Sequence, residues 1–170
     1  WQIKSFADIG GNKDEEFLKV LDIAARCREH GIAFELAING PKEFLRENGW
    51  PCTDAMEVSR DLWRYHGYIA SSRGEFSVAK HTYVKTNSGW FSDRTQCYLA
   101  TGRPAVVQET GFSATLPTGE GLLSWKTAGE AVGALARIEK EYNHHSQKAR
   151  EIAEEHFEAR KVLRKLLKAL

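Results

Sequence analysis

The sequence predicts an α/β fold in which a mostly parallel sheet lies between layers of helices, a Rossmann-like three-layer sandwich. Short apolar runs that suit buried strands alternate with stretches whose apolar residues recur at helical spacing. Glycine, proline or asparagine stands at many of the changes from one pattern to the other. The 170 residues, 42% of them hydrophobic, are enough for a single domain with a substantial core.

The first half of the chain predicts short strands separated by helices. Strands are expected at residues 6–9, 32–38 and 55–58. Helices are expected at 14–30, at 41–48 and after Ser59 and Asp61, where serine and aspartate suit a helix start. The first of these helices should end at Gly31. The residues expected on the buried faces are Phe17, Leu18, Leu21, Ala24 and Ala25 in the first helix, and Leu62, Trp63, Tyr65 and Ile69 in the third.

The second half predicts the rest of the sheet. A strand at 76–79 leads to a loop at 88–91, and Ser92 then caps a helix that runs to Thr101 and ends at Gly102. Strands follow at 104–108 and 122–125, and Thr127 caps a helix at 128–142. The remainder, 143–170, is expected to be a charged, amphipathic helical tail.

Composition excludes several classes of function. The formal net charge of +1 leaves no broad basic surface, so no nucleic acid partner is expected. No apolar run approaches the roughly 18 residues of a membrane span, and no leader is recognisable. Scattered cysteines at 27, 52 and 97 fit reduced thiols in a cytoplasmic protein. No histidine has a ligand-spaced partner, so no metal site is expected. The motifs of P-loop NTPases, dinucleotide-binding proteins and serine hydrolases are absent.

One block of sequence resembles a known family. From Ser88 the chain reads S-G-W-F-S-D-R-T-Q-C-Y-L-A-T-G-R-P-A-V-V-Q-E-T-G, ending at Gly111. This block resembles the donor-site unit in the C-terminal half of GT-B glycosyltransferases. The G-G-N-K of residues 10–13 and the L-P-T-G-E-G-L-L of residues 116–123 are also similar to members of that group, and the likeness extends over nearly the whole chain.

The resemblance implies a nucleotide-sugar-binding domain. The substrate would be a nucleotide-diphosphate sugar, with no further cofactor, and the acceptor-binding N-terminal half would not be part of this chain. In the family the active site lies between the halves, so we expect the chain alone to bind a donor without transferring its sugar; its catalytic residues stay unknown. The missing half should pack on the C-terminal helix, and membrane binding by that basic helix is the less favoured alternative.

The expected donor site surrounds the start of the helix at Ser92. Free N–H groups at a helix N-terminus suit a diphosphate, and the preceding glycine permits close approach. Arg94 would face the anion, but the alternative that it pairs with an acidic neighbour, Asp93 or Glu75, stays open. Residues placed in the site are Lys80, Gly89, Trp90, Phe91, Ser92, Asp93, Arg94, Glu109, Thr110 and Gly111.

Other candidates are less specific. Lys80 and Lys13 would neutralise the diphosphate, although surface lysines are often only solvated. Glu109 would bind hydroxyl groups of the sugar or ribose, unless it caps its own loop. A second glycine-rich loop, Thr118–Gly119–Glu120, is a further candidate.

The sequence also departs from the family. Many retaining relatives carry two glutamates flanking this loop and helix, and Gly89 and Cys97 stand at roughly those positions here. Ribose recognition must then differ or fall to Asp93 or Glu109. The alternative function is a non-catalytic interaction module of the same fold.

Overall fold

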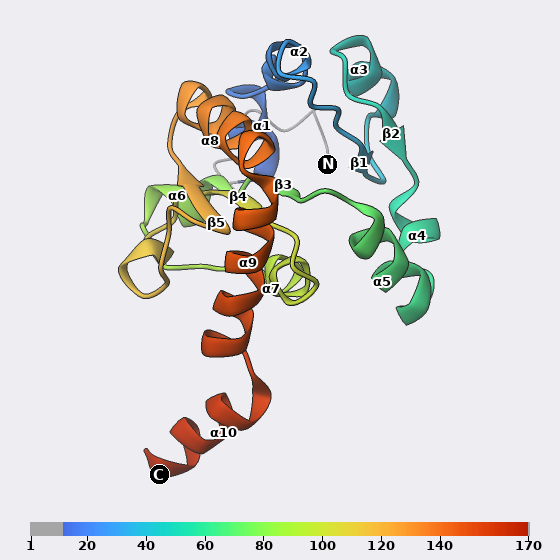
Figure 1. Cartoon of the computed structure of the whole chain (residues 1–170). Helices are drawn as coiled ribbons and strands as arrows, with labels where there is room; N and C mark the ends of the chain where they lie inside the picture. Colours follow the sequence, from blue (N-terminus) through green and yellow to red (C-terminus); the bar gives the residue numbers. More distant parts are fainter. Residues whose placement is uncertain (1–11, 170) are drawn as a thin grey trace.

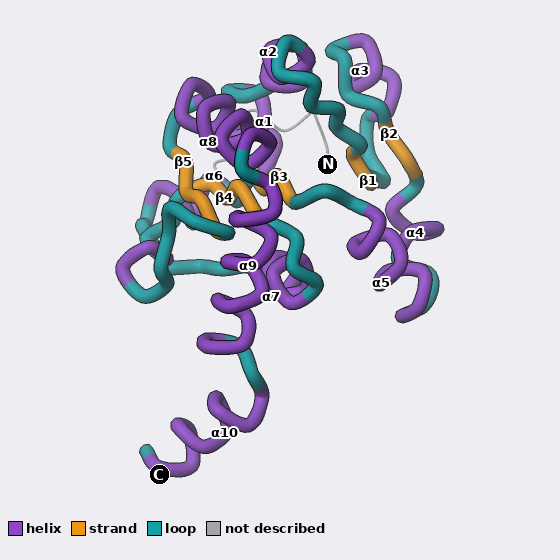
Figure 2. Tube along the Cα trace, in the orientation of Figure 1, coloured by secondary structure: helices purple, strands orange, loops and turns teal. Residues whose placement is uncertain are grey.

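The computed structural model describes residues 12–169, and the strand expected at 6–9 lies outside them. A parallel three-stranded sheet forms the centre, with helices above and below it (Figure 1). A second, two-stranded parallel sheet lies to one side, with helices close to it (Figure 2). The α/β class and the parallel sheet are therefore confirmed, although the strands are shared between two small sheets.

The central sheet has the order β3 (Glu75–Ser77), β4 (Ala105–Gln108) and β5 (Leu122–Trp125). Its strands are in parallel register, with Val106 opposite both Phe76 and Leu123. β4 is buried along its whole length, as expected for a strand with neighbours on both sides and helices on both faces. The strands expected at 76–79, 104–108 and 122–125 are thus confirmed, each within a residue or two.

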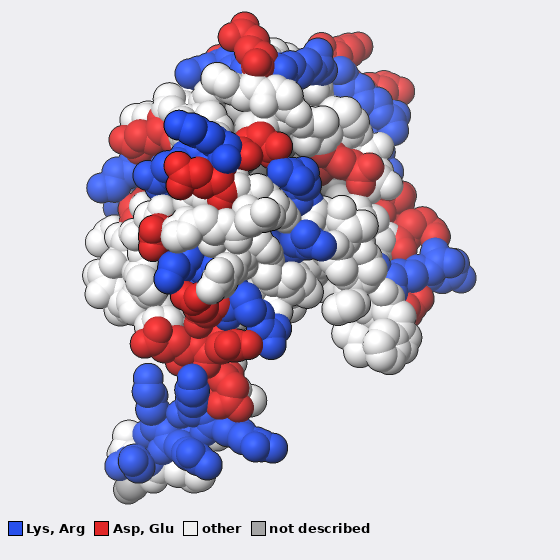
Figure 3. Space-filling view, viewed as in Figure 1, with Lys and Arg blue, Asp and Glu red and all other residues white. Residues whose placement is uncertain are grey.

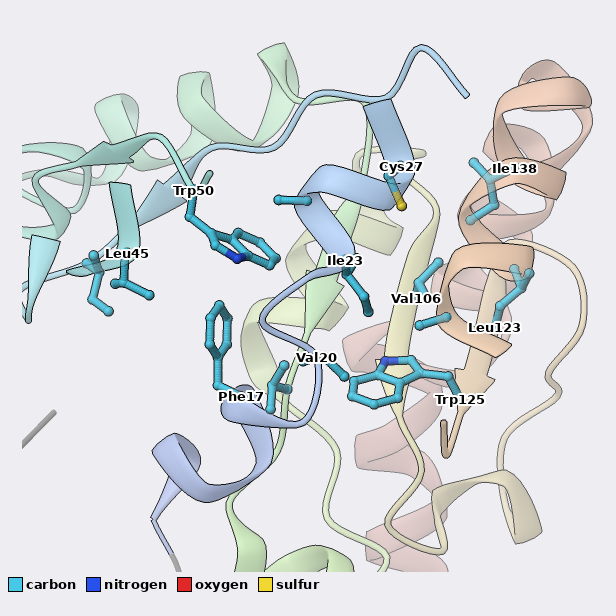
Figure 4. Packing of buried hydrophobic residues seen from close by; sticks show 14 residues of the cluster. Phe17, Val20, Ile23, Cys27, Leu45, Trp50, Val106, Leu123, Trp125 and Ile138 are labelled. Atoms are coloured by element: carbon cyan, nitrogen blue, oxygen red, sulfur yellow. The ribbon is translucent and has the colours of Figure 1, made fainter. Parts of the chain in front are cut away.

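Alternate residues along the strands pack into two separate hydrophobic cores, one on each face of the sheet. Val106, Leu123 and Trp125 pack on one face with α1 (Lys13–Leu18), α2 (Ile23–Arg28) and α8 (Ala128–Lys140) (Figure 4). Ala105, Val107 and Leu122 pack on the other face with α7 (Asp93–Ala100) and α9 (Tyr142–His156). Two cores separated by one sheet make the expected three layers.

Local capping explains why several helices begin where the sequence predicts. The Thr127 hydroxyl accepts a hydrogen bond from the Glu130 N–H, while the Glu130 carboxylate accepts from the Thr127 N–H, a capping box. Asp61 caps α5 (Leu62–Ser71) by accepting from the Trp63 and Arg64 N–H groups. α3 (Lys42–Glu47) begins one residue after the expected start at Pro41, which occupies the N-cap position instead.

The C-terminal tail is two helices rather than one. α9 ends at His156, with Phe157 as its C-cap. Glu158 then accepts hydrogen bonds from the Arg160 and Lys161 N–H groups to begin α10 (Ala159–Lys168). α10 projects away from the body of the protein, and its Lys and Arg side chains form a dense basic surface (Figure 3). Its large apolar side chains, Val162, Leu163, Leu166 and Leu167, are exposed by 45% to 69%.

The expected helix over 14–30 is wrong as a single element. Between α1 and α2 the backbone hydrogen bonds change to three-residue spacing, with Val20 N–H donating to Phe17 O and Ile23 N–H to Val20 O. This turn lets Phe17, Val20 and Ile23 all enter the core. In one straight helix with 3.6 residues per turn, residues spaced by three would point in progressively different directions.

The region around the small sheet also departs from expectation. Of the strand expected at 32–38, only β1 (Leu36–Ala37) pairs, with β2 (Cys52–Thr53). Residues 55–58 form α4 (Ala55–Val58) rather than a strand, because the Asp54 carboxylate caps the N–H groups of Met56 and Glu57. Leu62 and Trp63 were expected to be buried but are 73% and 79% exposed, while Ile69 of the same helix is buried.

Candidate functional site

The carboxyl ends of β3, β4 and β5 lie at one edge of the central sheet because the strands are parallel. Open α/β sheets bind ligands beyond this edge. Lys80 follows β3 and precedes α6 (His81–Lys85), and Glu109–Thr110–Gly111 follows β4 and precedes a 3-10 turn, η1 (Phe112–Ala114). The expected site residues after these two strands therefore share one edge.

The structure joins the aromatic–glycine loop to the loop after β4. The Gly89 N–H donates a 2.7 Å hydrogen bond to the Thr110 carbonyl oxygen. The Thr110 hydroxyl donates a 2.6 Å hydrogen bond to the Trp90 carbonyl oxygen. Gly89, Trp90 and Thr110, assigned to the site from separate stretches of sequence, are thus in direct contact.

Lys80 belongs to the same group through an aromatic pair. The rings of Trp90 and Tyr83 are stacked, with centroids 4.9 Å apart. The Lys80 ammonium lies 5.8 Å from the Tyr83 ring centroid, within cation–π range. The lysine and the two rings therefore form one half-exposed surface beside Thr110.

Gly111 and Glu109 shape the loop after β4. Gly111 has a φ of 99°, and a Cβ there would lie 2.9 Å from the Asn87 carbonyl oxygen, so glycine permits the two loops to meet. Glu109 is 9% exposed and accepts a 2.6 Å hydrogen bond from the Gly111 N–H. Burial acts to raise the pKa of Glu109, but hydrogen bonds from Ser113, Gly111 and Ser124 outweigh it and lower the pKa below its ordinary value. Glu109 therefore holds its own loop, the alternative that the sequence left open.

The three expected site residues at the start of α7 have different environments. Phe91 turns inward and stacks on Phe157, with ring centroids 5.6 Å apart, as part of the second core. Ser92 occupies the N-cap position but makes no side-chain cap hydrogen bond. The exposed Asp93 carboxylate accepts a 2.9 Å hydrogen bond from the Arg94 N–H instead. Of these three residues, Phe91 is partly buried, Ser92 is buried and Asp93 is exposed.

Arg94 pairs with an acidic neighbour. Its Nε lies 2.6 Å from the Glu75 carboxylate, and its Nη2 donates to the Ser77 hydroxyl oxygen at 3.1 Å. Burial acts to lower the pKa of Arg94, but the negative charge and hydrogen bond of the buried Glu75 carboxylate outweigh it and raise the pKa above its ordinary value. The second Glu75 oxygen, Oε2, is buried with no hydrogen-bond partner among residues 12–169. Arg94 thus spans from α7 to β3 as the partner of a buried carboxylate.

Lys13 completes a cluster of cations. Burial is the main cause that lowers its pKa to about 8; the charges of Arg94 and Lys80 lower it further, and Glu75 opposes them. Lys13, Glu75 and Arg94 also line a cavity of about 760 Å³ between β3 and residues 32–38. Arg94 and Lys80 each lie close enough to Lys13 for their charges to interact with it.

The structure adds a pair of residues that sequence patterns did not reveal. His81 Nδ1 lies 2.7 Å from Glu16 Oε1, and Glu16 is 2% exposed. Burial acts to raise the pKa of Glu16, but hydrogen bonds from Lys19, His81 and Gln108 outweigh it and lower the pKa below its ordinary value. Glu16 and His81 are 65 residues apart, so no local spacing could have indicated the pair.

The second glycine-rich loop lies elsewhere. Thr118, Gly119 and Glu120 precede β5 and so lie toward the amino ends of the strands. Glu120 pairs with His144 of α9 at 2.8 Å, and the Arg137 guanidinium donates to the Gly119 carbonyl oxygen at 2.7 Å. These contacts tie the loop to α8 and α9 rather than to the candidate site.

Within residues 12–169 no group of three or more His, Cys, Asp or Glu side chains could hold a metal ion. Nor does any helix in that range have the length and apolar character needed to cross a membrane. No protein-family model matches the sequence, and neither a curated protein nor a solved structure is significantly similar to it.

Proposed function

We propose that this chain is the donor-binding half of a glycosyltransferase and binds a nucleotide-diphosphate sugar at the carboxyl edge of the central sheet. The observation that carries the proposal is the contact between the Gly89–Trp90 loop and Thr110 beside Lys80. Chemically, a diphosphate needs cations and backbone N–H groups at one place, and a parallel sheet edge supplies such a place.

The charges favour an anionic ligand. Protonation of Lys13 carries a free-energy cost, because the side chain is partly buried and lies near two other cations. A bound diphosphate would relieve that repulsion and hold Lys13 in its charged form. In a transfer reaction the same cations would stabilise the departing nucleoside diphosphate.

The aromatic pair supplies a second type of contact. The stacked rings of Tyr83 and Trp90 are each partly exposed beside Lys80. An aromatic face of this kind packs against a sugar ring or a nucleobase, while Lys80 meets the phosphate. Asp93, with its exposed carboxylate, is the acidic residue best placed at this loop for a ribose or sugar hydroxyl, since Glu109 is engaged within its own loop.

The acceptor-binding half is the proposed partner of α10. The apolar residues of α10 recur at helical spacing along one side of the helix, and its basic residues occupy the other side. A second Rossmann-like domain packed on the apolar side would bury the four exposed side chains. In this proposal the complete enzyme works in the cytoplasm, where the free cysteines stay reduced.

The alternative is a non-catalytic interaction module. Arg94 is already paired with Glu75, and Glu109 already holds its own loop, so two expected ligand contacts are satisfied without a ligand. Neither Gly89 nor Cys97 supplies the acidic group found in many retaining relatives. This alternative predicts that the carboxyl edge binds no nucleotide.

Calorimetry with uridine, guanosine, adenosine and thymidine diphosphates separates the two functions. We expect one of them to bind, and Lys80→Ala to weaken that binding about tenfold, as for the loss of one charge-assisted contact. Lys140→Ala, on the exposed side of α8, is the matched control and should leave affinity unchanged. Binding of none of the four would favour the interaction module.

A further inference from the structure

His81 is held in place from two directions by a buried network. Its Nδ1 lies 2.7 Å from Glu16 Oε1, and the same oxygen accepts a 2.5 Å hydrogen bond from the Lys19 ammonium. Glu16 Oε2 accepts a 2.5 Å hydrogen bond from Gln108 Nε2, and Gln108 Oε1 accepts from the Ala79 N–H at 3.0 Å. The carboxylate that orients His81 is therefore fixed to both β4 and the end of β3.

This network also decides which imidazole nitrogen carries a proton. Glu16 accepts hydrogen bonds on both oxygens, so it is a carboxylate, and an ionised carboxylate can only accept. Nδ1 of His81 must then carry the hydrogen atom of the shared bond. Neutral His81 has a bare Nε2, and only the imidazolium form has an Nε2–H that can donate.

His81 differs from a histidine that merely fills a core. Its side chain is 30% exposed, and within residues 12–169 no hydrogen bond involves Nε2. His145, in contrast, is 2% exposed, and its Nδ1 accepts from the Gly121 N–H. The network thus orients Nδ1 of His81 and leaves Nε2 without a hydrogen bond among residues 12–169.

We propose that His81, as the imidazolium, donates an Nε2–H hydrogen bond to a phosphate oxygen of the donor's diphosphate, with Glu16 as its positioning residue. This inference rests on the proposed function, because it places His81 in the same anion site as the adjacent Lys80. A carboxylate behind a ligand-binding imidazole fixes the ring orientation and the proton position, as in metal and hydrolase sites.

The proposal requires a specific dependence on pH. Because only the imidazolium can donate from Nε2, binding should be weaker at higher pH. The charged groups that face His81 are Glu15 and Glu16 of α1. Lys19 pairs with Glu16, and Lys80 is the residue before His81 in the chain. Lys13, whose pKa is about 8, is mostly protonated at both about pH 5.5 and about pH 7.5, and it is common to the wild type and the variants.

The test is calorimetry of the full chain with inorganic pyrophosphate at those two pH values. His81→Asn is the diagnostic variant, because the asparagine amide can still donate to Glu16 from near the Nδ1 position while Nε2 is lost. His144→Asn is the matched control, since His144 also pairs with a glutamate at 2.8 Å but near the opposite strand ends. Comparing variants at each pH cancels the titration of pyrophosphate itself.

At about pH 5.5 we expect His81→Asn to weaken pyrophosphate about tenfold or more, and at about pH 7.5 to change it much less. The Cε1–H NMR signal of His81, assigned by its loss in the variant, should shift on binding, whereas that of His144 should not. Equal binding by wild type and His81→Asn at the lower pH would overturn this inference and leave the proposed function standing. No binding of pyrophosphate or any nucleoside diphosphate by the wild type would overturn both.

Discussion

The hydroxyl of Thr110 donates a 2.6 Å hydrogen bond to the carbonyl oxygen of Trp90, twenty residues earlier in the chain. Thr110 is 1% exposed, so the bond lies out of water. Together with the hydrogen bond from the Gly89 N–H to the Thr110 carbonyl oxygen, it joins the loop before α7 to the loop after β4. Any ligand at this edge would meet both loops at once.

Replacement of Thr110 by valine should loosen this contact between the two loops. The change keeps the shape of the side chain but leaves the Trp90 carbonyl oxygen without its partner, so we expect a loss of about 1–2 kcal/mol in the free energy of unfolding. Nucleoside diphosphate affinity should fall as well. Urea unfolding and calorimetry measure the two effects.

Thr110→Ser, which keeps the hydroxyl, should recover most of both losses. Thr86→Val is the control, because Thr86 is exposed and its hydroxyl donates to the Thr82 carbonyl oxygen one turn earlier in the same helix region. Equal effects of Thr110→Val and Thr86→Val would show that the loop contact contributes nothing particular.

Gly111 should tolerate alanine less well than Gly119. Both residues have positive φ, 99° and 114°, where alanine is strained by about 1 kcal/mol. Only at Gly111 would the new Cβ meet another loop, 2.9 Å from the oxygens of Asn87, whereas Gly119 has open space. We expect Gly111→Ala to cost at least about 1 kcal/mol more than Gly119→Ala in urea unfolding. Similar costs for the two variants would mean that the loops separate freely.

Elements with local signals were predictable from the sequence. Thr127 and Glu130 define the start of α8 by themselves, and Gly102, with a φ of 67°, ends α7 where the sequence expects. β4 and β5 were clear because both are short apolar runs with turn residues on each side. These signals lie within a few residues of the element that they specify.

The rest depended on distant partners. The apolar pattern at 14–30 fitted one helix, but the positions of Trp50, Val106 and Trp125 in the core favour two short helices with a turn. In the same way, Arg94 was predictable as a charged residue in the first turn of a helix, but its choice of Glu75 depended on how α7 crosses β3. The Glu16–His81 pair was missed for this reason too.

The ion pair of Arg94 and Glu75 should behave as a coupled unit. The Glu75 side chain is 4% exposed, so Arg94→Met would leave a carboxylate buried without its cation. We expect a loss of about 2–3 kcal/mol in the free energy of unfolding for that variant. Arg94→Met combined with Glu75→Gln should cost clearly less than the sum of the single changes.

A double-mutant cycle by urea unfolding measures this coupling, and the same variants test the ligand. If Arg94 serves only Glu75, the double variant should bind nucleoside diphosphate as the wild type does. A binding loss that persists in the double variant would instead assign Arg94 to the anion site. Additive stability effects would contradict the pairing itself.

Lys13 should give the free protein a distinctive stability profile at alkaline pH. Its pKa is about 8 in the folded chain and 10.5 in the absence of burial. Between these values the unfolded chain holds more protons than the folded one, so stability rises with pH across that window. Below about pH 8 both states are protonated and the cost of burying the charge is constant.

Lys13→Met removes that cost at every pH. The variant should therefore be more stable than the wild type at about pH 7, by on the order of 2 kcal/mol, and the difference should shrink toward about pH 10.5. Lys140→Met, at an exposed position, should follow the wild-type curve. Parallel profiles for wild type and Lys13→Met would show that Lys13 keeps an ordinary pKa, and the electrostatic argument for an anion beside it would fail.

A bound diphosphate should favour the protonated form of Lys13. Binding at about pH 8 should therefore take up protons, which calorimetry in buffers of different ionisation enthalpy detects.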